Sequence, residues 1–116
     1  MSPNEIVDAQ YAAYNAGDAE LLASFYAADV EITDLAGNLT LKGREAFQAR
    51  FAKTFAEFPQ NRAWSKNRIV LGNIVVDHEE GERAPGGERF EVVAIYTIKD
   101  GHIARLAMGK GDQEPR

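Results

Sequence analysis

The stretch KNRIVLGNIVVDHE (residues 66–79) decides the fold class, because it reads as two strands joined by the two-residue turn Gly72-Asn73. A two-residue turn fixes the register of the two strands, so Arg68 is expected to face Asp77 across the hairpin. Opposite charges directly across a strand pair stabilise the pair, which supports this register. The sequence therefore predicts an antiparallel hairpin formed by residues 61–71 and 74–80.

The two faces of this hairpin differ in character. Lys66 is expected to face Glu79 on the side of the charged pair, and Asn67 is expected to face His78 on the other side. We expect the charged side to point outward, so that His78 points into the interior. A neutral imidazole there could exchange a proton or polarise a carbonyl group, and His78 is one candidate catalytic residue. The alternative is a core histidine bonded to Asn67, and the sequence leaves both interpretations open.

Two more strands are expected after the hairpin, at residues 89–99 and 102–109. A flexible loop at 80–88 precedes them, and the turn Asp100-Gly101 joins them. Strand 89–99 is apolar on both faces, which indicates that both faces of the sheet are covered. Helices can cover one face only, so we expect a second copy of the chain on the outer face and hence a homodimer.

Helices and short strands are expected before the hairpin. A capping box at Ser2–Glu5 starts the first helix, residues 18–26 form a short second helix, and residues 43–59 carry phenylalanines at helical spacing. Alternation over 30–35 and a short apolar run at 39–41 predict two strands. Helices gathered on one face of an antiparallel sheet make an α+β fold.

The composition sets limits on function. The chain has 116 residues, of which 45% are hydrophobic and 27% charged, and it reads as one globular domain over residues 1–116 with a frayed tail at 110–116. It has no cysteine, which excludes disulfides and zinc–thiolate sites. A formal net charge of −5 makes nucleic acid and anionic membranes unlikely partners. His78 and Glu79 are adjacent on a strand and point to opposite faces, so we expect no metal site.

The sequence also gives an expectation about location. No basic segment followed by an apolar segment stands at the start of the chain, and the longest apolar run, 92–96, is too short to cross a bilayer. We therefore expect a cytoplasmic protein without a signal peptide.

The strings NAGD (15–18), FYAADVEITD (25–34) and KGRE (42–45), in this order of elements, resemble the nuclear transport factor 2-like (NTF2-like) superfamily. More narrowly, they resemble the SnoaL-like polyketide cyclases and the ketosteroid isomerases, and the resemblance covers residues 4–109. It implies a cone-shaped curved sheet on three helices, as in cystatin-like folds, that encloses a pocket for a small apolar molecule. It also implies a dimer and no cofactor.

The resemblance assigns roles to particular positions. Asp34 matches the carboxylate that shuttles a proton in the isomerases, and Tyr26 matches a pocket tyrosine of some members. Gln10 and Ala94 stand where the isomerases place their two donors to the substrate oxyanion. Alternation along its strand predicts that Asp34 points inward among apolar groups. Burial there would raise the pKa of its carboxyl into the range of a general base. The alternative is a turn residue that binds its own backbone.

Aromatic side chains are expected to line the pocket. We expect Tyr14, Tyr26 and Phe51 at the ligand, with one tyrosine donating to a ligand oxygen, and Tyr11 in the core. Asn67, Gln10 and Ala94 complete the predicted ligand-binding set. The function that follows is a small isomerase or cyclase that acts on an apolar carbonyl compound by proton abstraction. The alternative is a non-catalytic protein of the same fold that binds small hydrophobic ligands or serves as a dimeric scaffold.

Overall fold

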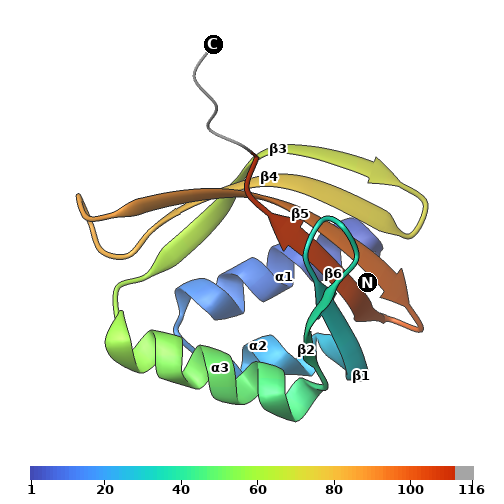
Figure 1. The fold of residues 1–116 in the computed structure, drawn as a ribbon, viewed down its shortest axis with the longest axis horizontal. Helices are drawn as coiled ribbons and strands as arrows, with labels where there is room; N and C mark the ends of the chain where they lie inside the picture. Colours follow the sequence, from blue (N-terminus) through green and yellow to red (C-terminus); the bar gives the residue numbers. More distant parts are fainter. Residues whose placement is uncertain (112–116) are drawn as a thin grey trace.

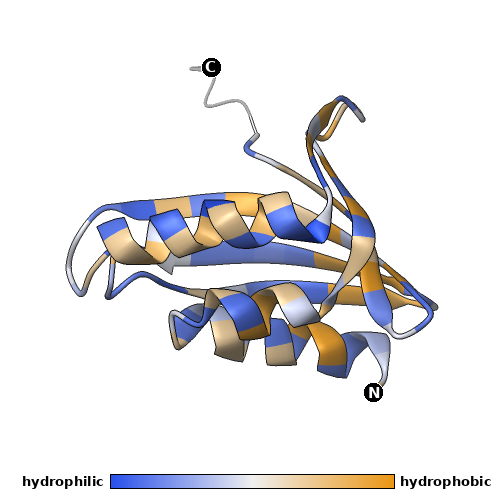
Figure 2. Cartoon of the chain, turned by 90° about the horizontal axis from the view of Figure 1, so that it is seen from below, coloured by the Kyte–Doolittle hydropathy of each residue, from blue (hydrophilic) through white to orange (hydrophobic). Residues whose placement is uncertain are grey.

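A computed structural model of the chain describes residues 1–111 and contains three helices, all on one side of a curved sheet (Figure 1). They are α1 (Pro3–Asn15), α2 (Ala19–Ser24) and α3 (Arg44–Glu57). Hydrophobic and hydrophilic residues alternate around each helix, as expected of helices that press one face onto a core (Figure 2).

Local signals explain where the helices start. The Ser2 side chain accepts a hydrogen bond from the backbone N–H of Glu5, whose carboxylate accepts one from the Ser2 N–H, so the predicted capping box is confirmed. Asp18 caps α2 through the Leu21 N–H, as its position indicated. The second helix is shorter than expected, however, because Tyr26 already belongs to the first strand.

Six strands follow one another in the order β2-β1-β6-β5-β4-β3 across one sheet. All neighbours are antiparallel except β1 and β6, which are parallel, so the sheet is mixed rather than purely antiparallel. The α+β fold of helices on a curved sheet is confirmed. The strands are β1 (Tyr26–Thr33), β2 (Leu39–Lys42), β3 (Arg62–Leu71), β4 (Ile74–Glu82), β5 (Arg89–Lys99) and β6 (His102–Gly109).

The β3–β4 hairpin has the expected register near its turn, and Arg68 pairs with Asp77. A bulge at Lys66 then shifts the register, so Ser65 rather than Lys66 lies opposite Glu79. The predicted pairing of Lys66 with Glu79 is therefore wrong. The Lys66 ammonium instead lies 3.3 Å from a carboxylate oxygen of Glu91 on the neighbouring strand β5.

The orientation of this hairpin is the reverse of the prediction. Asp77 is fully buried and Glu79 is 7% exposed, both on the face that the helices cover. His78 and Asn67 are exposed on the opposite face, where the His78 Nε2 lies 2.8 Å from a carboxylate oxygen of Glu91. The predicted pocket positions of His78 and Asn67 are thus wrong, because α1 supplies polar partners for Asp77 on the inner face.

The core lies between the helices and the sheet, and every helix and the strands β1, β3, β4, β5 and β6 contribute buried residues to it. Among residues 1–111, no helix is both long and apolar enough to cross a membrane. Strand β4 reaches Glu82, so the connection to β5 is residues 83–88, shorter than expected. The prediction of a frayed tail falls largely on residues 112–116, outside the described part of the chain.

Candidate active site

Two adjoining cavities lie between the helices and the inner face of the sheet. The mouth cavity has a volume of about 360 Å³, and the deep cavity has a volume of about 40 Å³. Both are lined by Tyr14, Phe51, Glu79 and Met108. The mouth cavity lies at the small end of the range of about 300–1,000 Å³ for ligand pockets. Its remaining lining residues are Thr54, Phe58, Arg83, Glu88, Arg89, Phe90, Val92 and Lys110.

Glu79 is the titratable residue that lines both cavities and has a strongly shifted pKa. Burial raises the pKa of its carboxyl to about 7, and the nearby charge of Asp77 acts in the same direction. The hydroxyl groups of Tyr11 and Tyr96 oppose this shift because they stabilise the charged form. A carboxyl with a pKa near neutrality can both take up and release a proton at physiological pH.

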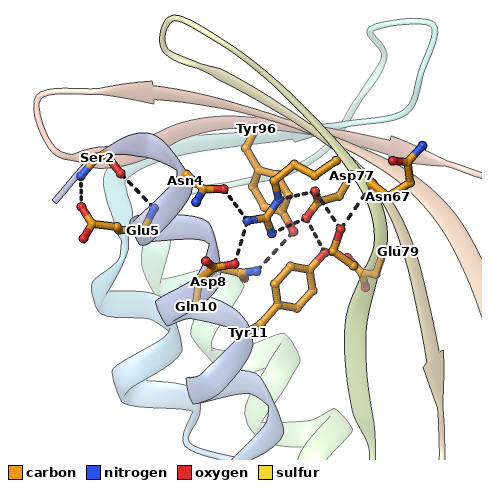
Figure 3. A network of polar contacts seen from close by, with 12 residues as sticks. Ser2, Asn4, Glu5, Asp8, Gln10, Tyr11, Asn67, Asp77, Glu79 and Tyr96 are labelled. Atoms are coloured by element: carbon orange, nitrogen blue, oxygen red, sulfur yellow. Dashed lines mark hydrogen bonds and ion pairs between the residues drawn. The ribbon is translucent and has the colours of Figure 1, made fainter.

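The Tyr11 hydroxyl connects Glu79 to a second buried acid. It lies 3.0 Å from Oδ2 of Asp77 and 3.0 Å from Oε1 of Glu79, as Figure 3 shows. A phenol has one proton to donate, so it cannot serve two ionised carboxylates at once. Protonated Glu79 resolves this conflict, since it can donate to the Tyr11 oxygen while Tyr11 donates to Asp77.

Arg68 forms an ion pair with Asp77 and holds it in position. Its Nε and Nη2 donate to the two Asp77 oxygens at 2.6 and 2.9 Å, a bidentate pair. Its Nη1 donates to Asn4 and Asp8 of α1, each at 2.7 Å. The bidentate contact with Arg68 explains how a fully buried aspartate is tolerated, and the two contacts with α1 hold Arg68 in place.

Tyr14 presents a hydroxyl that is free to donate. Its oxygen accepts a 2.6 Å hydrogen bond from Nδ2 of Asn61, and within residues 1–111 no acceptor takes its own proton. The ring is held edge-on against Phe51 and Phe55, with centroids 5.9 and 5.3 Å away. Burial raises the pKa of Tyr14, so it stays protonated at neutral pH. Tyr14 therefore suits the role of donor to a ligand oxygen.

The deep end of the site is closed by a chain of polar side chains. The Tyr26 hydroxyl donates to Oε1 of Gln10 at 2.9 Å, and Nε2 of Gln10 donates to the Tyr96 hydroxyl at 3.3 Å. Ala94 is fully buried on the same inner face, opposite Asp77. Gln10 and Tyr26 thus line the deep cavity as expected, but their polar groups bind one another.

Asp34 does not lie in this site. It sits after the end of β1, where its carboxylate accepts hydrogen bonds from the N–H groups of Ala36 and Asn38 and from the Asn38 side chain. These bonds lower the pKa of Asp34, the side chain of Asn38 most strongly, whereas the prediction required burial to raise it. The predicted inward-facing base is therefore wrong, and the alternative of a turn residue is correct.

The predicted set missed most of the residues that line the mouth cavity, including Glu79 and Arg83, and it also missed Asn61, which binds both Tyr14 and Arg83. The signal that could have found Glu79 is strand β5, whose inner residues Val92 and Ala94 pair with Glu79 and Asp77. Asn61 is the first residue of the expected strand 61–71 and Arg83 falls in the expected loop 80–88, and nothing in the sequence indicates that they meet.

A wider depression of about 530 Å³ lies elsewhere, between β1, β2 and the β5–β6 turn. Exposed side chains of both charges line it, including Lys42 and Lys99, and none of its residues is buried. His102, beside this turn, is exposed as predicted. Within residues 1–111, no group of three or more histidine, aspartate or glutamate side chains could hold a metal ion.

Comparison with known proteins points to one family. The model of the SnoaL-like domain family matches residues 7–106. A cystatin-fold protein from Novosphingobium aromaticivorans is 30% identical with a TM-score of 0.85, and the match covers 95% of this chain and 99% of that one. No curated protein matches the sequence.

Two more distant structures share the fold. A Sinorhizobium meliloti protein proposed to be a polyketide cyclase is 24% identical (TM-score 0.74; 90% of this chain and 94% of that one). A Catenulispora acidiphila protein with a ketosteroid isomerase-like fold, solved with trimethylamine, is 23% identical (TM-score 0.74; 95% and 87%).

Proposed function

The chain belongs to the SnoaL-like family of the NTF2-like superfamily, and from this premise we propose that it catalyses a proton transfer on a small, mainly apolar carbonyl compound without a cofactor. The observation that carries the proposal is Glu79, a buried carboxyl with a pKa of about 7 on the wall of the mouth cavity. The Tyr14 hydroxyl lines the same cavity and has a proton to donate.

The proposed step needs only these two groups. Ionised Glu79 removes a proton from the carbon next to the carbonyl group, and the electron pair of the broken C–H bond forms the enolate. Tyr14 donates a hydrogen bond to the enolate oxygen, and Glu79 then returns the proton to the same or another carbon. One well-placed donor to a developing oxyanion contributes about 3–4 kcal/mol to transition-state stabilisation. Tyr14 thereby takes the role of the two donors that are replaced by Gln10 and Ala94 in this chain.

Deuterium exchange tests this proposal without knowledge of the natural substrate. The protein is incubated in D₂O with a panel of small ketones and keto acids, and NMR follows the loss of the proton next to the carbonyl. We expect the exchange rate to rise with pH up to about 7 and then to level off, because the base must be ionised. Glu79→Gln is expected to abolish this exchange.

Asp34→Asn is the matched control, since it removes the same charge at the position that the sequence alone favoured. It should leave exchange unchanged because Asp34 lies in a turn away from the cavity. Loss of exchange in Asp34→Asn, with full exchange in Glu79→Gln, would refute the assignment of the base. Ligand binding without exchange in both wild type and Glu79→Gln would favour the alternative, a non-catalytic binding protein.

We also propose that a second copy covers the outer sheet face. The outer patch, defined as the aliphatic side chains that point away from the helices on β3, β4 and β5, includes Ile69 (63% exposed), Leu71 (78%) and Val93 (36%). Charges of both signs lie beside it, including Lys66 and Glu91. Such a surface is self-complementary under a two-fold axis, where each charge can meet its opposite on the partner. The remaining members of the patch are Ile74, Val76 and Ile95.

A further inference from the structure

We propose that the mouth cavity binds the carboxylate group of its ligand through Arg83, so that the ligand class is a small organic acid with an apolar body. The proposal rests on the proposed function in that it concerns the same cavity. It adds a binding residue and a chemical class that neither the family nor the similar structures supply.

Arg83 differs from the other arginines of strands β3, β4 and β5 and their connections. Arg62 pairs with Glu82, Arg68 with Asp77, and Arg89 with Glu80 and Glu82. Among residues 1–111, no carboxylate oxygen lies within 4.0 Å of the Arg83 guanidinium. A half-buried guanidinium without an anionic partner is an unusual feature that an anionic ligand would complete.

The guanidinium is nevertheless held in place. Its carbon lies 5.2 Å from the ring centroid of Phe58 and 4.6 Å from that of Phe90, so cation–π contacts fix it between two aromatic walls of the cavity. Nη1 makes one long hydrogen bond of 3.4 Å to Oδ1 of Asn61, whose amide group also binds Tyr14. The remaining donors of the planar guanidinium are suited to the two oxygens of a carboxylate.

The charges around the cavity favour an anion at its mouth. Lys110 also lines the mouth and adds a positive charge, whereas the charge of Arg89 is compensated by Glu80 and Glu82. Two negative charges oppose them, Glu88 and, when ionised, Glu79, and both residues line the cavity. The backbone carbonyl of Glu88 accepts a hydrogen bond from the Arg83 N–H at 2.9 Å. A ligand carboxylate at the mouth leaves the apolar body of the ligand for the deeper part of the cavity.

The apolar residues of the cavity determine the size and polarity of the ligand outside its carboxylate group. Phe51, Val92 and Met108 are apolar residues that line the same cavity as Arg83 and Glu79. A volume of about 360 Å³ suits a single ring or a short chain better than a polycyclic compound. The ligand class is therefore a monocarboxylic acid with one ring or a short alkyl chain and, for the proposed reaction, a carbonyl group that Glu79 and Tyr14 reach.

Three probes with one body and different head groups test the inference: 3-phenylpropanoate, 3-phenylpropanamide and 3-phenylpropylamine. Each is titrated into the full chain at constant ionic strength, and binding is followed by NMR chemical shifts and by calorimetry. We expect the acid to bind at least about tenfold more tightly than the amide, as a charge-assisted bidentate contact implies. Arg83→Gln should remove this preference and leave binding of the amide unchanged.

Arg50→Gln is the matched control, because Arg50 is exposed on α3 outside the cavity and the change in net charge is the same. It should keep the preference for the acid. Arg83→Lys retains the charge but not the planar pair of donors, so an intermediate preference is expected even if Arg83→Gln proves poorly folded. Glu88→Gln should strengthen binding of the acid.

The inference is overturned if the acid and the amide bind equally, if the amine binds most tightly, if Arg83→Gln leaves the preference intact, or if no probe binds. These outcomes are separate from those of the exchange experiment. Exchange on neutral ketones that depends on Glu79, without any preference for acids, would support the proposed function and refute the role of Arg83. Acid binding that depends on Arg83, without any exchange, would support the role of Arg83 and refute the proposed function.

Discussion

At Glu79, burial and hydrogen bonding act on one carboxyl in opposite directions, and burial dominates. Glu79 and Asp77 both contact the Tyr11 hydroxyl, and Asp77 also forms an ion pair with Arg68. Neutral Glu79 satisfies this arrangement, while ionised Glu79 is the form that can remove a proton from a ligand. The residue thus holds a proton in the resting site at a pH where an ordinary glutamate has lost it.

This proton has a consequence for stability. The folded-state pKa of Glu79 is raised from 4.5 to about 7, so between these values the folded protein keeps a proton that the unfolded chain releases. The contribution of Glu79 to the free energy of unfolding is therefore lost as pH rises from 4.5 through 7, by about 3 kcal/mol in total. We expect Glu79→Gln to remove this loss, so that the variant gains stability relative to wild type between pH 5 and pH 8.

Urea denaturation at several pH values in this window measures the effect. Glu57→Gln, on the exposed end of α3, is the control and should keep the wild-type pH dependence. Parallel curves of stability against pH for wild type and Glu79→Gln would contradict the raised pKa.

At the scale of the elements, strand β4 has one buried face and one more exposed face, and the two faces carry different side chains. Asp77, Glu79 and Gly81 are buried on the inner face, while His78 is exposed and Glu80 half-buried on the outer face. Gly81 lies beneath the ring of Phe90 on β5, which packs on the Arg83 guanidinium. The absence of a side chain at Gly81 therefore lets this aromatic wall of the cavity approach the sheet.

Gly81→Ala tests this role. A Cβ at this position would overlap the Phe90 ring and come within 2.6 Å of the backbone oxygen of Arg62, and backbone cannot move aside easily. We expect a loss of about 1–3 kcal/mol in the free energy of unfolding, together with weaker binding at the mouth cavity, measured by urea denaturation and ligand titration. A Cβ at Gly111 meets no atom of residues 1–111 within 4 Å, so Gly111→Ala should be neutral. A Gly81→Ala variant as stable as wild type would contradict the close packing of Phe90 and the Arg62 backbone against Gly81.

At the scale of the whole molecule, the sheet has two apolar faces and only one set of helices. The helices cover the inner face (Figure 1), and the side chains of the outer patch stay exposed on the single chain. Exposed aliphatic residues clustered on one sheet face are typical of an interface rather than of a solvated surface. The same patch explains why Ile74 and Val76 are apolar although they point away from the core.

Sedimentation equilibrium measures the predicted dimer. Wild type is expected at twice its chain mass of 12.8 kDa, and Val93→Glu is expected to dissociate it, because the interface would then bury a carboxylate without a partner on each chain. Leu39→Glu changes another exposed leucine (55% exposed) on the edge strand β2, outside the patch, and should remain dimeric. A monomeric wild type would refute the dimer, and an unchanged Val93→Glu dimer would place its interface elsewhere.

The features that the sequence determined by itself are those that depend on near neighbours in the chain. The capping box at Ser2, the cap at Asp18 and the turn at Gly72-Asn73 all arise from local hydrogen bonding and backbone geometry. Alternation and helical spacing then indicated the α+β class, because each element must bury one face. Tyr14 and Phe51 were likewise expected at a pocket from their positions on the helices, and both line the mouth cavity.

Only the tertiary structure decided which face of the hairpin became the interior. Both faces of the hairpin carry aliphatic residues. Hydrophobic patterning therefore does not distinguish a face that packs on the core from a face that a partner chain would cover. The decision comes from α1, whose Asn4 and Asp8 complete the Arg68–Asp77 pair and so make a charged pair tolerable inside. Long-range packing of this kind placed Glu79 in the cavity and left His78 outside, because burial of a charge depends on partners that are distant in the sequence.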